Sequence, residues 1–191
     1  YVLWLAKQAR VPVRVAHSHS DTSSLQASAT ITRRLYLALT RRLIWRSATV
    51  GLSDSNAAGA ALYGRQWQQT PRWQLLSLGI DVTPFEAPIE RAAVRSEFGI
   101  PENAFVVGHV GRFVQVKNQR FIIQIAEELV RRKPETRLLL IGDGPLRPAV
   151  ERQVREARLT EHVIFAGLRN DVPRLMRGAM DVFCMPSFLV R

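Results

Sequence analysis

The sequence predicts an α/β protein built on parallel sheets, and two observations support this prediction. Apolar runs at 104–111, 136–142 and 163–167 have the length and continuity of strands that are buried on both faces. Segments with helical periodicity lie between these runs. Because parallel strands need long crossover connections, which are usually helices, this alternation indicates parallel sheets covered by helices on both faces.

The second half of the chain has the clearer helical patterns. A helix is predicted over residues 118–133. Its apolar stripe is expected to consist of Phe121, Ile122, Ile125 and Leu129. The next predicted helix follows the strand at 136–142, and one of its faces carries Leu146, Val150, Val154 and Ala157. A short helix at 171–179 and a strand at 181–187 complete this half.

The first half has shorter elements. It opens with a helical pattern at Tyr1, and further helices are predicted at 31–48 and 56–64. Strands are predicted at 11–17, 49–55 and 73–81, and the first of them leads into a loop, HSHSDTSS (17–24). Residues 82–90 contain two prolines and no periodicity. We therefore expect two domains, residues 1–84 and 85–191.

Composition limits the classes of protein that this chain can represent. It has 191 residues, 47% of them hydrophobic, and no apolar run long enough to span a membrane. The one cysteine, Cys184, excludes an internal disulfide, and we expect it to be a buried thiol in a reducing, cytoplasmic compartment. Because the chain starts at Tyr1 within a helical pattern and stops at Arg191 just after a strand, we interpret it as an internal fragment with both domains incomplete.

The positive charge is concentrated in the first half. The net charge is +11, and residues 1–84 carry ten Lys or Arg but only three Asp. Such an excess favours an anionic partner, whether a membrane surface, a nucleic acid or an acidic substrate. An arginine-rich composition with solvated faces would account for the same charge.

The segment GRFVQVKN (111–118) joins a predicted strand to a predicted helix. Ligands of open parallel sheets bind at the carboxyl ends of strands. Gly111 allows close approach of the backbone, Arg112 offers a planar fork, and Lys117 adds a compact charge beside the helix N-terminus. These features predict a phosphate or diphosphate site, although cations that are merely solvated remain the alternative. The P-loop and dinucleotide-binding patterns are both absent.

Five segments in order carry a resemblance to a known family. They are RVAHSHSD (14–21), LLSLGIDVTPF (75–85), VVGHVGRFVQVKNQRFII (106–123), LLLIGDGPLRPAVE (138–151) and VIFAGLRNDVPRLMRGAMDVFCMPS (163–187). Together they resemble the family 4 retaining glycosyltransferases, also called group 1, which have the GT-B fold of two Rossmann-like domains. Leu78 departs from the pattern, because the family usually has Asn there.

The resemblance implies a role for several residues. Arg112 and Lys117, with Gly111, would hold the diphosphate of a UDP- or GDP-sugar, and His17 would contact the donor sugar from the first domain. His19 is expected to share the loop of His17. Further nucleotide contacts would come from Gly142, Asp143, Gly144, Leu168 and Arg169. The alternatives are that the glycines serve only their own turn and that Asp143 caps a helix, while His109 and His162 are expected to be structural.

The resemblance also implies a reaction. A hexosyl group would pass, without metal or other cofactor, from a nucleotide-diphosphate sugar to a glycan or lipid-linked acceptor, as in polysaccharide biosynthesis. The family has an acidic pair whose first Glu should fall at position 190, but Val190 stands there. We therefore expect the isolated chain to be inactive, and a non-catalytic relative that only binds nucleotide sugars remains open.

Other functions remain possible for the positively charged first half of the chain. Five arginines and several leucines on the helix at 31–48 suggest peripheral contact with the anionic inner face of a membrane, although a solvated domain helix is the alternative. The stretch RQWQQTPRW (65–73) interleaves cations with Trp, as nucleic-acid-binding surfaces do, but no nucleic-acid-binding motif accompanies it, so we expect no nucleic acid partner. A GT-B epimerase is a further alternative, which the motif at 111–118 disfavours.

Overall fold

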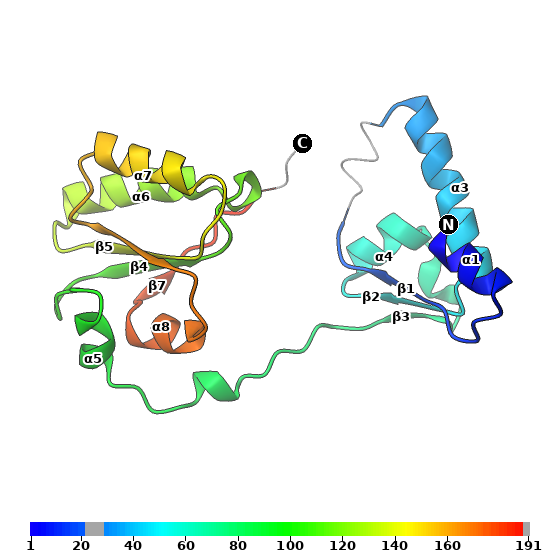
Figure 1. Ribbon diagram of the computed structural model, residues 1–191, viewed down its shortest axis with the longest axis horizontal. Coiled ribbons are helices and arrows are strands. Elements are labelled where there is room, and N and C mark those ends of the chain that lie inside the picture. The colour runs from blue at the N-terminus through cyan, green and yellow to red at the C-terminus, as the bar shows by residue number, and fades with distance from the viewer. Residues whose placement is uncertain (22–28, 189–191) are drawn as a thin grey trace. The chain divides into compact units, whose positions relative to one another are not determined.

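Two parallel sheets organise the chain (Figure 1). The computed structural model describes residues 1–21 and 29–188. Residues 22–24 of the predicted loop and Val190 lie outside them. One unit ends at Ile80 and the other begins at Asp81. This division falls four residues before the predicted boundary, because the short 3-10 helix η2 (Thr83–Phe85) packs against helix α8 (Val172–Gly178) of the second unit.

The first unit is a three-stranded sheet with helices. Its elements are α1 (Val2–Gln8), β1 (Val15–Ser18), α3 (Ile31–Ser47), β2 (Val50–Ser53), α4 (Asn56–Tyr63), η1 (Trp67–Gln69) and β3 (Trp73–Leu75). All strands are parallel, in the order β1-β2-β3. Side chains cap the N-termini of two helices, because Thr30 accepts from the Arg33 N–H at the start of α3 and Ser55 accepts from the Ala58 N–H at the start of α4. Strand β3 is shorter than predicted, since Leu76, Leu78 and Ile80 beyond it are exposed.

The second unit is a four-stranded parallel sheet, in the order β6-β5-β4-β7. Its elements are α5 (Arg91–Ser96), β4 (Val106–Val110), η3 (Gln115–Lys117), α6 (Gln119–Arg132), β5 (Arg137–Ile141), α7 (Arg147–Glu156), β6 (Val163–Gly167), α8 (Val172–Gly178) and β7 (Val182–Phe183). Helices α6 and α7 cover one face, and α5 and α8 cover the other (Figure 1). The predicted parallel α/β architecture is confirmed, although helix α5 was not anticipated.

The apolar stripe predicted for α6 is partly wrong. Ile122, Ile123 and Ala126 are buried against the sheet, whereas Phe121 is 46% exposed. The apolar residues of α6 occupy one broad side of the helix, with Ile122 and Ala126 near its middle and Phe121 at its edge, so the sheet covers the middle and leaves Phe121 exposed. In α7 the predicted Val150 and Val154 are buried, but Leu146 precedes the helix and remains exposed.

Candidate functional site

Backbone hydrogen bonds tie together the loops that leave β4, β5 and β6. The Gly111 N–H donates to the carbonyl of Ile141 at 2.9 Å, and the Phe113 N–H donates to the carbonyl of Asp143 at 2.9 Å. The Gly142 N–H in turn donates to Gly167 at 2.8 Å. The three loops therefore continue the parallel pairing of the strands beyond the sheet edge, which gives this edge a defined backbone surface.

Two glycines allow the first two loops to approach each other. Gly142 has a φ of +128°, and a Cβ there would overlap the carbonyl of Gly111. A Cβ on Gly144 would lie 2.6 Å from the carbonyl oxygen of Phe113. These glycines therefore serve the contact between loops as well as their own turn.

A cavity of about 610 Å³ opens at this edge. Seven of the predicted residues line it, namely Gly111, Arg112, Gly142, Asp143, Gly144, Leu168 and Arg169. Val110, Ile141 and Val172 add an apolar wall that sequence reasoning missed. The sequence could have indicated two of them, because Val110 and Ile141 are the last residues of the strands that precede the predicted loops. The structure thus gathers residues from three loops, far apart in the sequence, around one hollow.

Arg112 and Lys117 bring positive charge to this edge without carboxylate partners. Within residues 1–21 and 29–188, neither side chain makes a hydrogen bond or an ion pair, and Arg112 is exposed. Lys117 does not line the cavity itself, but its Cδ lies 3.5 Å from the Cβ position of Gly111, at the cavity wall. Helix α6 begins beside them after Asn118, whose side chain does not cap it. Two cations and an uncapped helix N-terminus can hold an anion.

Asp143 and Arg169 have local partners within the cavity wall. One carboxylate oxygen of Asp143 accepts the Gly144 N–H at 2.7 Å, and the N-cap of α7 is Leu146, so the helix-capping alternative for Asp143 is wrong. Arg169 forms a two-pronged ion pair with Asp171, at 2.8 and 2.9 Å. This pair lowers the pKa of Asp171 to about 2. Arg169 is therefore less available for a ligand than Arg112.

His17 belongs to a small polar cluster in the first unit. It is exposed on β1, and its ring centroid lies 3.8 Å from that of His19. The Nδ1 atom of His19 lies 3.7 Å from a carboxylate oxygen of Asp54. Asp54 was missed in the sequence, although it follows β2, the strand that pairs with β1. The parallel pairing brings the ends of these two strands together.

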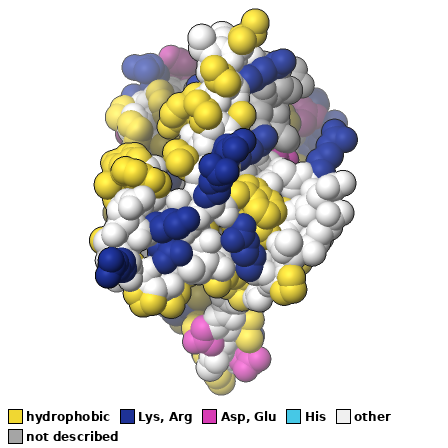
Figure 2. All heavy atoms as spheres, turned by 90° about the vertical axis from the view of Figure 1, so that its right-hand side faces the viewer, with side chains coloured by type: hydrophobic (Ala, Val, Ile, Leu, Met, Phe, Trp, Pro, Cys, Tyr) yellow, Lys and Arg dark blue, Asp and Glu magenta, His cyan; other side chains and the backbone are white. Residues whose placement is uncertain are grey.

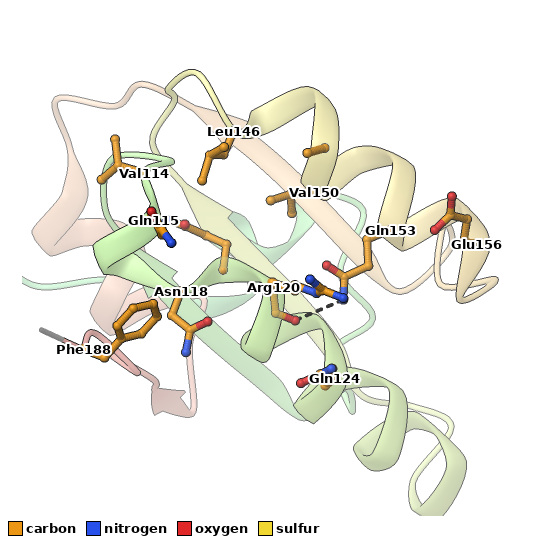
Figure 3. Close-up of a pocket in the computed structure, with 12 residues that line it drawn as sticks. Val114, Gln115, Asn118, Arg120, Gln124, Leu146, Val150, Gln153, Glu156 and Phe188 are labelled. Carbon is orange, nitrogen blue, oxygen red and sulfur yellow. Dashed lines mark hydrogen bonds between the residues drawn. The ribbon is translucent and has the colours of Figure 1, made fainter. Parts of the chain in front are cut away.

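A second cavity, of about 550 Å³, lies between α6 and α7 (Figure 3). Gln115 and Asn118 reach it from the same loop that carries Lys117, and Gln153 faces Arg120 across it, donating a hydrogen bond to the Arg120 carbonyl at 3.1 Å. Leu146 and Val150 form part of its apolar wall. None of the residues that line this second cavity also lines the cavity at Arg112.

The residues that suggested nucleic acid binding are part of the core. Trp67 and Trp73 are 2% and 3% exposed, and they pack with Tyr63. The guanidinium of Arg72 lies 4.8 Å from the ring centroid of Trp73. Because the tryptophan faces are covered, this stretch cannot stack on bases, and the nucleic-acid alternative loses its main support.

No helix in residues 1–21 or 29–188 has the length and apolar character needed to cross a membrane. In the same residues, no three His, Cys, Asp or Glu side chains gather closely enough to hold a metal ion.

Sequence relatives of the chain are sugar-transferring enzymes by name. A model of the family described as glycosyl transferases group 1 matches residues 90–189. EpsF of Bacillus subtilis, named as a glycosyltransferase, is 38% identical over 189 residues, which are 98% of this chain and 48% of EpsF. The 2-deoxystreptamine glucosyltransferase of Streptomyces kanamyceticus is 40% identical over 103 residues, which are 53% of this chain and 27% of that enzyme.

A solved structure shows the same fold. The crystal structure of HepE from Anabaena in complex with UDP matches with a TM-score of 0.79 and 23% identity, over 97% of this chain and 50% of HepE. The fold is thus of the GT-B type, as the resemblance implied. The chain spans about half the length of EpsF and of HepE. Because the family model covers more than half of the sequence, the chain belongs to the group 1 glycosyltransferases.

Proposed function

We propose that the protein is a retaining glycosyltransferase that moves a hexosyl group from a UDP- or GDP-sugar to a glycan or lipid-linked acceptor. The observation that carries this proposal is the pair of cations, Arg112 and Lys117, without carboxylate partners in the described residues, at a cavity lined by backbone. The family membership and the complex of HepE with UDP support a uridine nucleotide as the first donor to test.

The charges have a chemical purpose in this proposal. Cleavage of the bond between sugar and phosphate leaves negative charge on the departing diphosphate. Cations that are already in place stabilise this charge as it develops, without the cost of reorganising water. Arg112 can make two parallel bonds to phosphate oxygens, and Lys117 adds a point charge. We propose that no metal or other cofactor takes part.

His17 would supply the contact to the donor sugar from the first unit. Its exposed ring at the carboxyl end of β1 can donate to or accept from a sugar hydroxyl. His19, just after β1, lies against it, and Asp54, just after β2, lies beside His19.

The decisive experiment is a donor-binding and transfer assay with UDP-glucose and GDP-mannose. We expect one donor to bind to this chain. Because the isolated chain is expected to be inactive, transfer is assayed with the protein translated from the whole gene, where we expect the sugar to reach an acceptor with the anomeric configuration unchanged, which NMR of the product reports. Inversion at the anomeric carbon would overturn the retaining mechanism. Nucleotide binding without transfer would favour the non-catalytic relative, for which Val190 is the sequence argument.

We also propose peripheral contact with an anionic membrane, through α3. Leu35, Tyr36, Leu39 and Leu43 are all at least 41% exposed on this helix. Arg33, Arg42 and Arg46 are exposed on it too. Figure 2 shows hydrophobic side chains between Lys and Arg side chains on this side of the first unit. Apolar residues beside cations match an anionic lipid surface.

Vesicle co-sedimentation tests this contact. We expect more protein to bind vesicles with anionic lipid than neutral vesicles, and Leu39→Ser to weaken that binding, whereas Ala38→Ser serves as the matched control on the same helix. Equal binding to both vesicle types would remove the electrostatic part of the proposal. The location at the cytoplasmic face of the membrane stays a prediction.

A further inference from the structure

Buried hydrogen bonds connect the end of β7 to the loop that carries Arg112. The Nδ1 atom of His109 lies 2.9 Å from the carbonyl oxygen of Cys184, and its Nε2 atom lies 3.3 Å from Nε2 of Gln119. Gln119 Nε2 also donates to the carbonyl oxygen of Arg112, at 2.9 Å. His109 and Gln119 are 0% and 2% exposed, so water does not compete for these bonds.

The partners decide where the protons lie. The carbonyl of Cys184 only accepts, so Nδ1 of His109 carries the proton. The amide nitrogen of Gln119 only donates, so Nε2 of His109 must be unprotonated. Reversing the Gln119 amide would place its oxygen against the carbonyl oxygen of Arg112, which excludes the reversed orientation. His109 is therefore neutral and in a single tautomer.

Two more bonds join the same segments. The side-chain amide of Asn118 donates to the carbonyl of Pro186 at 3.4 Å, and the Phe188 N–H donates to the carbonyl of Val116 at 3.0 Å. The loop at 111–118 is thus attached to residues 184–188 at its start, middle and end. Its conformation depends on contacts outside the loop itself.

We propose that His109 and Gln119 are positioning residues, which hold the Arg112 backbone so that its guanidinium and Lys117 face a bound diphosphate. This role rests on the proposed function of the cavity. Protonation of His109 would set an N–H against the donating amide of Gln119. The hydrogen bond between the two side chains would then be lost at pH values below the pKa of His109, and with it the support of the Arg112 loop. The groups near the ring are the carbonyl of Cys184, just after β7, and the charge of Lys117, on η3; no carboxylate bonds to the ring in the described residues.

The local environment agrees with a neutral ring. Burial lowers the pKa of His109, and although the bond to Cys184 raises it, the charge of Lys117 lowers it further, so the net shift is downward. The neutral form therefore dominates at neutral pH and yields to the charged form only in acid.

NMR on the 191-residue chain tests the bonds without any ligand. Long-range 1H–15N spectra should show a proton on Nδ1 of His109 and none on Nε2. Gln119→Leu should shift the backbone amides of residues 112–117, whereas Gln124→Leu, an exposed site on the same helix, should leave them unchanged. A proton on Nε2, or unchanged loop amides in Gln119→Leu, would overturn the proposal. If Gln119→Leu does not fold, the position of the His109 proton in the wild-type chain decides whether the proposed hydrogen bonds exist.

Calorimetry with UDP and GDP tests the consequence for the diphosphate. Gln119→Leu removes the bonds to His109 and to the carbonyl of Arg112, so it should weaken nucleotide binding by roughly 5- to 10-fold, with little change in Gln124→Leu. The difference between wild type and Gln119→Leu should shrink as the pH falls through the pKa of His109. Equal affinity in all three chains would refute the positioning role. If the wild-type chain binds neither nucleotide, the proposed function fails, and the NMR result judges the hydrogen bonds separately.

Discussion

Gly142 lies directly against the carbonyl group of Gly111, so close that a Cβ at Gly142 would overlap the carbonyl oxygen. This contact joins the turn after β5 to the loop after β4, and both line the cavity beside Arg112. Because Gly142 also has a positive φ of +128°, two separate physical reasons favour glycine there.

Replacing Gly142 by Ala should therefore cost stability and disturb the cavity. We expect a loss of about 2–4 kcal/mol in the free energy of unfolding, from backbone strain and displacement of Gly111. Gly79→Ala is the control, since a Cβ there meets nothing within 4 Å. Urea denaturation measures both. A loss no larger than that of Gly79→Ala would contradict the tight contact.

Removing the charge of Arg112 should weaken nucleotide binding. Arg112→Ala loses charge-assisted hydrogen bonds to phosphate, so we expect UDP affinity to fall roughly 10- to 100-fold. The UDP affinity of Arg112→Lys should lie between those of wild type and Arg112→Ala, since lysine keeps the charge but not the planar guanidinium. Arg152→Ala, an exposed site on α7, is the control. If Arg112→Ala and Arg152→Ala bind UDP equally in calorimetry, Arg112 does not contact the nucleotide.

Tyr63 should hold β1 and β2 together through its hydroxyl group. This oxygen lies 2.7 Å from the carbonyl oxygen of Ala16 and 2.9 Å from that of Leu52. Tyr63→Phe should lower the free energy of unfolding by about 1–2 kcal/mol, because a buried bond is lost. Tyr36→Phe, an exposed site on α3, should change it little. Equal melting of the two variants would count against this role.

Alkaline pH should weaken the same contact. Burial, partly offset by the bond to Leu52, raises the pKa of Tyr63 to about 12. A group whose pKa is higher in the folded state stabilises most below its unfolded pKa of about 10, and this contribution is lost as the pH rises through 12. Denaturation at rising pH should show a steeper loss for wild type than for Tyr63→Phe. Parallel curves would exclude the titration of Tyr63.

Asp181 should stabilise the second unit above acid pH. Its oxygens lie 2.8 Å from guanidinium nitrogens of Arg91 and Arg95, and one accepts the Val106 N–H. Burial raises the pKa of Asp181, but Val106 and the two arginines outweigh this effect and hold the pKa below its usual value. The stabilisation is therefore present above about pH 4 and lost as the pH falls through the lowered pKa.

Asp181→Asn tests this contribution. Since Arg95 is only 6% exposed and would lose its buried counter-charge, we expect a loss of about 2–4 kcal/mol at neutral pH. The difference in unfolding free energy between wild type and Asp181→Asn should disappear at acid pH. Glu127→Gln, an exposed carboxylate on α6, is the control. A pH-independent gap in urea denaturation would mean that the carboxylate charge is not what matters.

Much of the second unit follows from local chemistry that the sequence displays. Buried strands such as β5 appear as uninterrupted apolar runs, and Pro and Gly separate them from the helices, so the order of elements and the parallel sheet are predictable. The loop at 111–118 is predictable as a candidate site for the same reason, because it follows a strand and precedes a helix. These features depend on residues that are neighbours in the chain.

The tertiary structure decided what depends on residues far apart in sequence. Contact with the sheet decided which part of the broad apolar side of α6 is buried, since it covers Ile122 and Ala126 and leaves Phe121 at the edge exposed. Trp67 and Trp73 became core residues through packing with Tyr63, which no local pattern distinguishes from an exposed aromatic stretch. The link from Cys184 through His109 to Gln119 joins segments 75 residues apart, and only folding, which removes these polar groups from water, makes them partners.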